Sequence, residues 1–199
     1  MATIEQVLIH WFGDLRTLKD YPANHAKMWF TKSDQTDQDL RRMFAEDVEL
    51  ASRGRPREWQ ESPRGMLALI LLLDQFSRNI WRGQARAFAQ DSLALSYCKK
   101  GLSLKWDREL AHIQRVFFYL PLEHAESLAD QDRCVGLFEK LLSEVPKAQE
   151  PHYRSFLAYA EKHREVIARF GRFPHRNAIL KRSSTAEEMA FLAIPGSSF

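Results

Sequence analysis

The amino-acid sequence predicts an all-α protein that folds as one domain over residues 1–199. Apolar residues recur at helical spacing in nearly every segment. Strand signals are nearly absent, because the chain has no Asn-Gly or Asp-Gly hairpin turn and no sustained alternation of polar and apolar residues. No Gly/Ser-rich or charged linker divides the chain, so we expect about eight or nine helices in a single unit.

Helix start and stop signals define the first elements. Thr3 can cap a helix that ends near Gly13, and Asn24 can cap a short helix over residues 25–30. Residues 34–54 carry acidic side chains at their start, which favours a helix because its N-terminus bears partial positive charge.

The most apolar segment begins with Ser62 and Pro63, a capping residue followed by a proline at the first helical position. From Met66 to Leu73 it is apolar on every side, so we expect the central, buried helix here. This run is far shorter than the ~20 apolar residues that span a membrane, so no membrane partner is predicted.

The remaining helices follow from similar signals. Pro121 predicts a kink inside one helix, and Gly101 and Gly171 are placed to end two others. Ser184 and Glu187 have the spacing of a capping box. The expected ranges are 85–100, 107–128, 132–145, 149–170 and 183–194.

One helix has the spacing of a tetratricopeptide unit. Cys134, Phe138, Leu141 and Pro146 follow the small–Phe–apolar–Pro pattern of the second helix in such a repeat. This pattern favours antiparallel helix pairs stacked in a tetratricopeptide-like superhelix over a four-helix bundle.

Composition excludes several classes of protein. The net charge of +3 is spread along the chain without a long single-sign block, which makes nucleic-acid binding unlikely. Cys98 and Cys134 lack metal or redox spacing and are expected to be buried free thiols in a reducing compartment. The N-terminus lacks the pattern of a signal peptide, so we expect a cytoplasmic protein. No metal-binding or cofactor-binding motif is found, so neither a metal nor a cofactor is predicted.

The first candidate cluster is in the stretch LDQFSRNIW. Asp74 and Arg78 are four residues apart and can form an ion pair, which burial would make nearly obligatory. Such a pair can simply close the core. Alternatively, Arg78, Asn79 and Arg82 extend from the helix end into a cleft, where Gly83 would allow close approach to the backbone.

The second cluster contains Glu123 and His124. His124 shares its helical face with apolar residues, which is more typical of a core histidine than of a ligand. Glu123 lies on another face with Arg115 and Tyr119, which suggests a polar ladder within the helix.

The third cluster is in the stretch RFGRFPHRNAIL. Pro174 is expected to start a short helical turn, which would place His175, Arg176 and Asn177 at a helix N-terminus that favours anions. Arg172 adds positive charge nearby. These arginines could equally satisfy buried carboxylates such as Asp74. We predict that this stretch meets the end of the DQFSRN helix in space.

The motifs together resemble a known family. The stretches LLLDQFSRNIWRG, RAFAQDSLAL, FFYLPLEHAESLADQ and FGRFPHRNAIL, with VLIHWFGD at the start, are similar to an uncharacterised bacterial family, the domain of unknown function numbered nine hundred and twenty-four. The resemblance covers nearly the whole chain and implies an all-helical, tetratricopeptide-like fold. It implies no activity, substrate or catalytic residue. Ser77 stands where proline is common in the family.

Three hypotheses for function follow. The leading one is a pocket that binds a small anionic molecule or an acidic peptide end. A second is an enzyme in which His124 or His175 acts as general acid–base while Arg78 and Arg176 hold an anionic substrate. A third is a protein–protein adaptor whose motifs are purely structural. The expected lining residues are Asp74, Arg78, Asn79, Arg82, Glu123, His124, Arg172, His175, Arg176 and Asn177.

Overall fold

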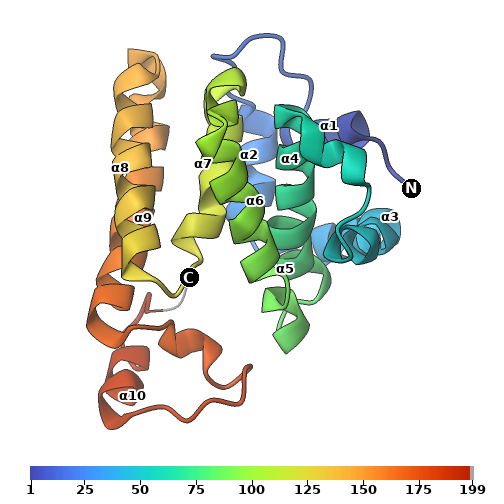
Figure 1. The fold of residues 1–199 in the computed structure, drawn as a ribbon. Helices are drawn as coiled ribbons and strands as arrows, with labels where there is room; N and C mark the ends of the chain where they lie inside the picture. Colours follow the sequence, from blue (N-terminus) through green and yellow to red (C-terminus); the bar gives the residue numbers. More distant parts are fainter. Residues whose placement is uncertain (198–199) are drawn as a thin grey trace.

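The computed structural model describes residues 1–197, and within that range it is helical without strands (Figure 1). The segments α4, η2 and α5 join end to end, so these residues contain nine separate α-helices, as the sequence predicts. The helical segments are α1 (Ile4–Phe12), α2 (Ala23–Phe30), α3 (Asp34–Ser52), α4 (Pro63–Ile70), η2 (Leu71–Phe76), α5 (Ser77–Ile80), α6 (Asp91–Ser103), α7 (His112–Glu123), α8 (Leu128–Glu144), α9 (Glu150–Phe170) and α10 (Ala186–Leu192). Short 3₁₀ helices are η1 (Arg57–Glu61), η3 (Ala85–Phe88), η4 (Trp106–Glu109), η5 (Lys147–Gln149) and η6 (Pro174–Arg176).

The helices pack around α4. Every residue from Met66 to Leu73 is buried, which confirms the prediction of a central apolar helix. Figure 1 shows α8 and α9 as an antiparallel hairpin on one flank, with α7 between this hairpin and the helices around α4. The segment after α9 turns back beneath the hairpin and carries α10 (Figure 1).

Most predicted helix ends are confirmed because local chemistry determines them. Thr3 caps α1 in a capping box, and Ser62 caps α4 ahead of Pro63. Gly13 and Gly171 follow α1 and α9 with positive φ angles of 70° and 68°, a conformation that glycine adopts without steric cost.

Two predicted caps were displaced by neighbouring residues. Asn24 lies inside α2, which begins at Ala23 after Pro22. The capping box of α10 uses Thr185 and Glu188, one residue beyond the predicted pair. Ser184 instead accepts a hydrogen bond from the Asn177 side chain at 3.1 Å.

Gly101 does not end a helix, contrary to the prediction. It lies within α6, and a Cβ atom there would be 2.4 Å from Cζ of Phe118. This glycine therefore lets α6 pack closely against α7. The chain leaves α6 later, where Lys105 takes a left-handed conformation with φ of 61°.

The helix predicted for residues 107–128 is interrupted. The structure has η4, then α7, with Pro121 in its last turn, and α8 begins at Leu128. The Gln131 amide nitrogen donates to the carbonyl oxygens of Glu123 at 2.6 Å and Ala125 at 2.8 Å. This side chain thus satisfies backbone acceptors left open where α7 ends.

Candidate functional site

The two Arg-Asn motifs meet at Asp91, the first residue of α6. Arg78 of α5 binds this carboxylate through both terminal nitrogens, at 3.0 and 3.1 Å. Arg176 of η6 reaches the same carboxylate at 3.1 Å. The Phe88 ring centroid lies 5.1 Å from the Arg78 guanidinium carbon and 4.8 Å from that of Arg176. The predicted meeting of the two motifs is confirmed at these arginines.

Asp74 is the most deeply buried charged group of the cluster, with no solvent exposure. Its Oδ1 lies 2.7 Å from Nδ1 of His124 and 3.6 Å from a terminal nitrogen of Arg78. Its Oδ2 accepts a hydrogen bond from the Gln75 amide at 2.6 Å. Burial alone would raise the pKa of the Asp74 carboxyl, but His124 and Arg78 outweigh burial and hold that pKa well below its usual range. The predicted Asp74–Arg78 ion pair is therefore present.

A π-helical turn, η2, carries Asp74. Such a turn inserts one residue into an α-helix and changes the direction of the side chains that follow. The Ser77 hydroxyl donates to the Leu73 carbonyl at 2.5 Å, which satisfies a backbone acceptor within this turn. Because π-helical turns are rare and are frequently found at functional sites, the position of Asp74 on one draws attention to this cluster.

Glu123 and His124 end α7 opposite His163 of α9. His163 Nδ1 donates to the Tyr159 carbonyl at 2.8 Å and lies 3.2 Å from Oε1 of Glu123. Burial, with a contribution from Asp74, raises the pKa of Glu123 to about 8. Burial, with a contribution from His124, lowers the pKa of His163 to about 3. At neutral pH the two groups are therefore a protonated carboxylic acid and a neutral imidazole.

This contact corrects one prediction. Arg115 and Tyr119 do form a ladder on α7, with Nε of Arg115 donating to the tyrosine hydroxyl at 3.1 Å. Glu123 does not join it, because its carboxyl group contacts His163 on the neighbouring helix.

Arg176 is nearly enclosed, with 7% of its side chain exposed. Its Nε has no hydrogen-bond partner among residues 1–197, and its guanidinium carbon lies 4.5 Å from the Phe173 ring centroid. Burial and the positive charge of Arg78 lower the pKa of Arg176 to about 10. Burial, followed by the charges of Arg176 and Arg78, lowers the pKa of His175 to about 4. Burial is the main cause of both shifts, and the charges of Arg78 and Arg176 add to it.

Other residues of the same stretch tie α10 to the fold. Arg172 binds both carboxylate oxygens of Glu188, at 2.6 and 2.8 Å. The Asn177 amide donates to the same carboxylate at 3.3 Å and accepts from Arg182 at 2.9 Å. Arg182 also binds both oxygens of Glu126. Arg172 and Asn177 thus bind Glu188 of the C-terminal segment, whereas Arg176 binds Asp91.

The chain is similar to other proteins over most of its length. The model of the family described as "Bacterial protein of unknown function (DUF924)" matches residues 7–196. The chain belongs to this family. Among solved structures, the protein of unknown function ATU0120 from Agrobacterium tumefaciens is similar, with 37% sequence identity and a TM-score of 0.76 over 87% of this chain and 92% of that one. A search of curated proteins found no match.

Two predicted residues of this DUF924 protein lie apart from the cluster. Arg82 binds both oxygens of Asp37 in α3, at 2.6 and 2.8 Å, and so ties the end of α5 to α3. Asn79 is half-buried in α5, and its side chain makes no hydrogen bond within the part of the chain that the structure describes. The structure therefore does not bring either residue to Asp91.

Sequence reasoning missed three members of the cluster. Phe88 precedes α6 and Asp91 begins it, and nothing local distinguishes these residues from an ordinary helix start. His163 lies in α9 without a motif around it, and only its contact with Glu123 of α7 marks it. A signal for these residues could come only from contacts between distant segments.

Two further findings bear on function. Among residues 1–197, no group of three His, Cys, Asp or Glu side chains is arranged to hold a metal ion. None of the described helices combines the length and apolar character required to cross a membrane.

Proposed function

We propose that this DUF924 protein binds a small anionic molecule beside Arg176, at the meeting point of the two Arg-Asn motifs. The observation that carries the proposal is the buried Nε of Arg176, which has no hydrogen-bond partner among residues 1–197. A buried donor without a partner costs roughly 1–3 kcal/mol, and an oxyanion would remove that cost. The guanidinium geometry suits a carboxylate or a phosphate.

Electrostatics supports the same proposal. Asp91 is shared between Arg78 and Arg176, and Arg78 also pairs with Asp74, so Arg176 has only a share of one carboxylate. The pKa values of His163 and His175 are both lowered by burial first, and then in part by neighbouring cations that include Arg176. A bound anion would offset this positive potential and would raise both histidine pKa values.

Access for a ligand is provided at the edge of the cluster. The side chains of Arg78 and Asp91 are 19% and 20% exposed, and that of His124 is 14% exposed. Water therefore reaches one side of these groups while Asp74 stays buried. An anion entering there would approach the guanidinium groups of Arg78 and Arg176, which share Asp91.

Calorimetric titration with sodium phosphate, sodium acetate and a Glu-Glu dipeptide, at constant ionic strength, tests the proposal. We expect one of these anions to bind the native protein, and Arg176→Gln to weaken that binding by at least tenfold. Arg169→Gln is the matched control, because Arg169 forms an exposed pair with Glu187. Equal binding by the native protein and folded Arg176→Gln, or no binding of any anion, would contradict the proposal.

A second candidate function is acid–base catalysis by His124. The specific observation is the 2.7 Å contact between Nδ1 of His124 and the buried Asp74, which orients the imidazole and leaves Nε2 to exchange a proton. Burial lowers the pKa of His124 even though Asp74 raises it, and this direction favours the neutral ring that a general base requires. Arg78 and Arg176 would hold the anionic part of that substrate.

Measuring the turnover of each anion that binds the native protein tests this candidate. His124→Gln should retain anion binding and lose turnover, whereas His152→Gln, on an outer face of α9, should retain both. Equal turnover by His124→Gln and the native protein would eliminate this candidate. The adaptor hypothesis gains support only if the protein neither binds nor converts these anions and a protein partner is isolated.

We also propose how the chain is organised. Residues 1–199 form one domain, because α7 packs against both the α8–α9 hairpin and the helices around α4. The α8–α9 hairpin is consistent with a tetratricopeptide-like arrangement, since consecutive antiparallel helices are the unit of such folds. Cytoplasmic action is supported by Cys98 and Cys134, which are buried and not joined in a disulfide.

A further inference from the structure

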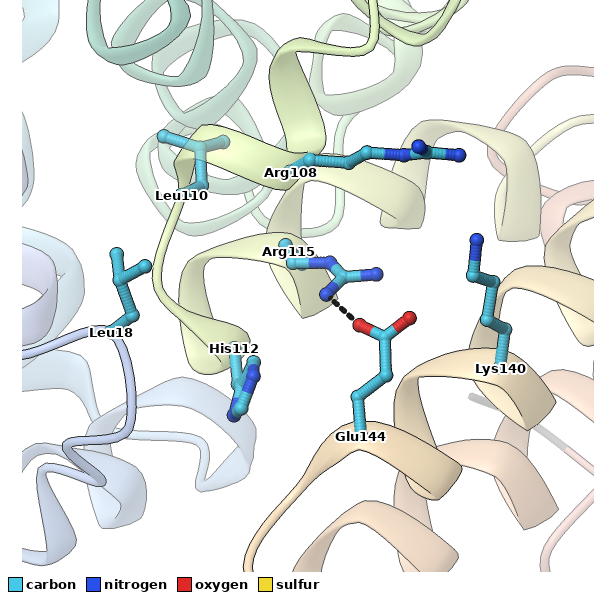
Figure 2. A pocket seen from close by; sticks show the side chains of 7 residues that line it. All are labelled: Leu18, Arg108, Leu110, His112, Arg115, Lys140 and Glu144. Carbon is cyan, nitrogen blue, oxygen red and sulfur yellow. Dashed lines mark hydrogen bonds and ion pairs between the residues drawn. The ribbon is translucent and has the colours of Figure 1, made fainter.

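A second basic site lies at the opposite end of α7 from the Arg176 cluster. A cavity of about 270 Å³ opens there between the chain after α1, η4, the start of α7 and the C-terminal half of α8 (Figure 2). Its lining residues are Leu18, Arg108, Leu110, His112, Arg115, Lys140 and Glu144. The start and end of α7 are eleven residues apart, roughly 16 Å along the helix axis, so this cavity is separate from the Arg176 cluster.

The charges around this cavity do not balance. Arg108, Arg115 and Lys140 are cations, and Glu144 is the one carboxylate that lines the cavity. Figure 2 shows the Arg115 guanidinium directed at Glu144. The charged ends of Arg108 and Lys140 lie on the side of the cavity opposite Leu18. The cavity therefore keeps an excess of two positive charges.

The start of α7 adds to this excess. An acidic residue in the first helical turn would be favourable, but α7 has none and begins instead with His112. Arg115 follows at the end of the same turn and is 5% exposed. A sequence that breaks a local rule without compensation within the fold is expected mainly at functional sites.

One polar atom is left to a ligand. Nδ1 of His112 is buried and has no hydrogen-bond partner among residues 1–197. Leu18 and Leu110 form the apolar side of the cavity, so the polar groups are gathered on the sides formed by η4, α7 and α8. The volume of about 270 Å³ lies just below the ~300–1,000 Å³ typical of small-molecule sites, which limits the ligand to a few heavy atoms beyond the anionic group.

We infer that this cavity binds phosphate or a small phosphate monoester. A phosphate dianion balances the two excess charges, whereas a monocarboxylate balances one. Its tetrahedral oxygens can accept from the three separate cations at once, with Arg115 held in place by Glu144 at the back of the cavity. The inference does not depend on the function proposed for the Arg176 cluster.

Titration of the full-length protein with sodium phosphate, followed by NMR of the His112 imidazole at constant ionic strength, tests the inference. We expect a saturable shift of the His112 signals. Lys140→Gln and Arg108→Gln, which change exposed residues, should each weaken binding by about tenfold. Arg57→Gln removes the same charge from an exposed position outside the cavity and should leave the affinity within twofold of the native value.

The same experiment separates the two sites. Arg176→Gln should leave the His112 response unchanged, so failure of one proposal does not entail failure of the other. No saturable shift in the native protein, or equal affinity in Lys140→Gln and Arg57→Gln, would overturn the inference. Acetate that binds as tightly as phosphate would overturn the assignment of a dianion.

Discussion

The two ends of α7 place similar residues in different surroundings. At its C-terminal end, His124 contacts Asp74, which has no solvent exposure and also pairs with the largely buried Arg78. At its N-terminal end, His112 and the buried Arg115 line an open cavity whose other cations, Arg108 and Lys140, are exposed. Burial therefore decides what the charges do. Near Asp74 they are paired within the fold, and Nε of Arg176 is left to a ligand, whereas around the open cavity the exposed cations are available to one.

The same comparison predicts where a substitution changes the stability of the fold. Charges in the closed cluster interact strongly because little water screens them, but they must be paired to be stable there. The exposed charges around the open cavity, Arg108 and Lys140, are screened by water and contribute little to folding. A substitution should thus have a large effect on stability near Asp74 and a small one near Lys140.

The largest expected effect is that of Asp74→Asn. This change leaves Arg78 and His124 without their buried anionic partner, so we expect a loss of about 3–5 kcal/mol in the free energy of unfolding. Denaturant unfolding at pH 7 measures it. Asp132→Asn, which removes a carboxylate from an exposed pair with Arg164, should cost less than about 1 kcal/mol. Similar losses in both variants would show that the cluster does not behave as a buried network.

A change in pH, acting through Glu123, should have an intermediate effect on the free energy of unfolding. The pKa of Glu123 is raised to about 8 in the folded protein, against roughly 4.3 in the unfolded chain, so the folded state binds the proton more tightly. The stability that this proton confers is complete below pH ~4 and is lost as pH rises through 8.

Glu123→Gln provides the comparison, because glutamine is neutral at every pH. Between pH 5 and 8, the native protein should lose stability relative to this variant by up to about 1.4 kcal/mol per pH unit. Urea unfolding of both proteins across this range checks the prediction. Parallel stability curves would mean that Glu123 is ionised in the fold.

A feature could be predicted from the sequence when the residues that form it are close together in the chain. Thr3, Ser62 and Gly171 were correctly identified as helix ends, because a cap depends on a few adjacent residues. Gly101 was misassigned, because its role is to admit Phe118 from the next helix. A local pattern cannot distinguish a glycine that ends a helix from one that lets two helices pack closely.

The same rule applies to the candidate site. The Asp74–Arg78 pair could be predicted, since residues four apart meet on a helix. The Asp91–Arg176 contact joins residues 85 positions apart, and no local pattern indicates it. Arg172 and Arg176 looked equivalent in the sequence, yet one binds Glu188 beside α10 and the other reaches Asp91.

The smallest effect is expected at the open end of α7. Glu144→Gln removes the anionic partner of Arg115, but about a third of the Glu144 side chain is exposed and water can replace it. We expect a cost of about 1 kcal/mol or less in the free energy of unfolding, measured by denaturant titration. A loss as large as that of Asp74→Asn would contradict the distinction between the two ends.

The central claim, that an anion binds beside Arg176, is tested most directly by an anomalous-diffraction map of native crystals soaked in sodium selenate, a tetrahedral dianion. We predict a selenium peak whose oxygens lie about 3 Å from Nε of Arg176. Selenate bound elsewhere on the protein, with Nε of Arg176 hydrogen-bonded to a protein group and no peak beside it, would contradict the claim.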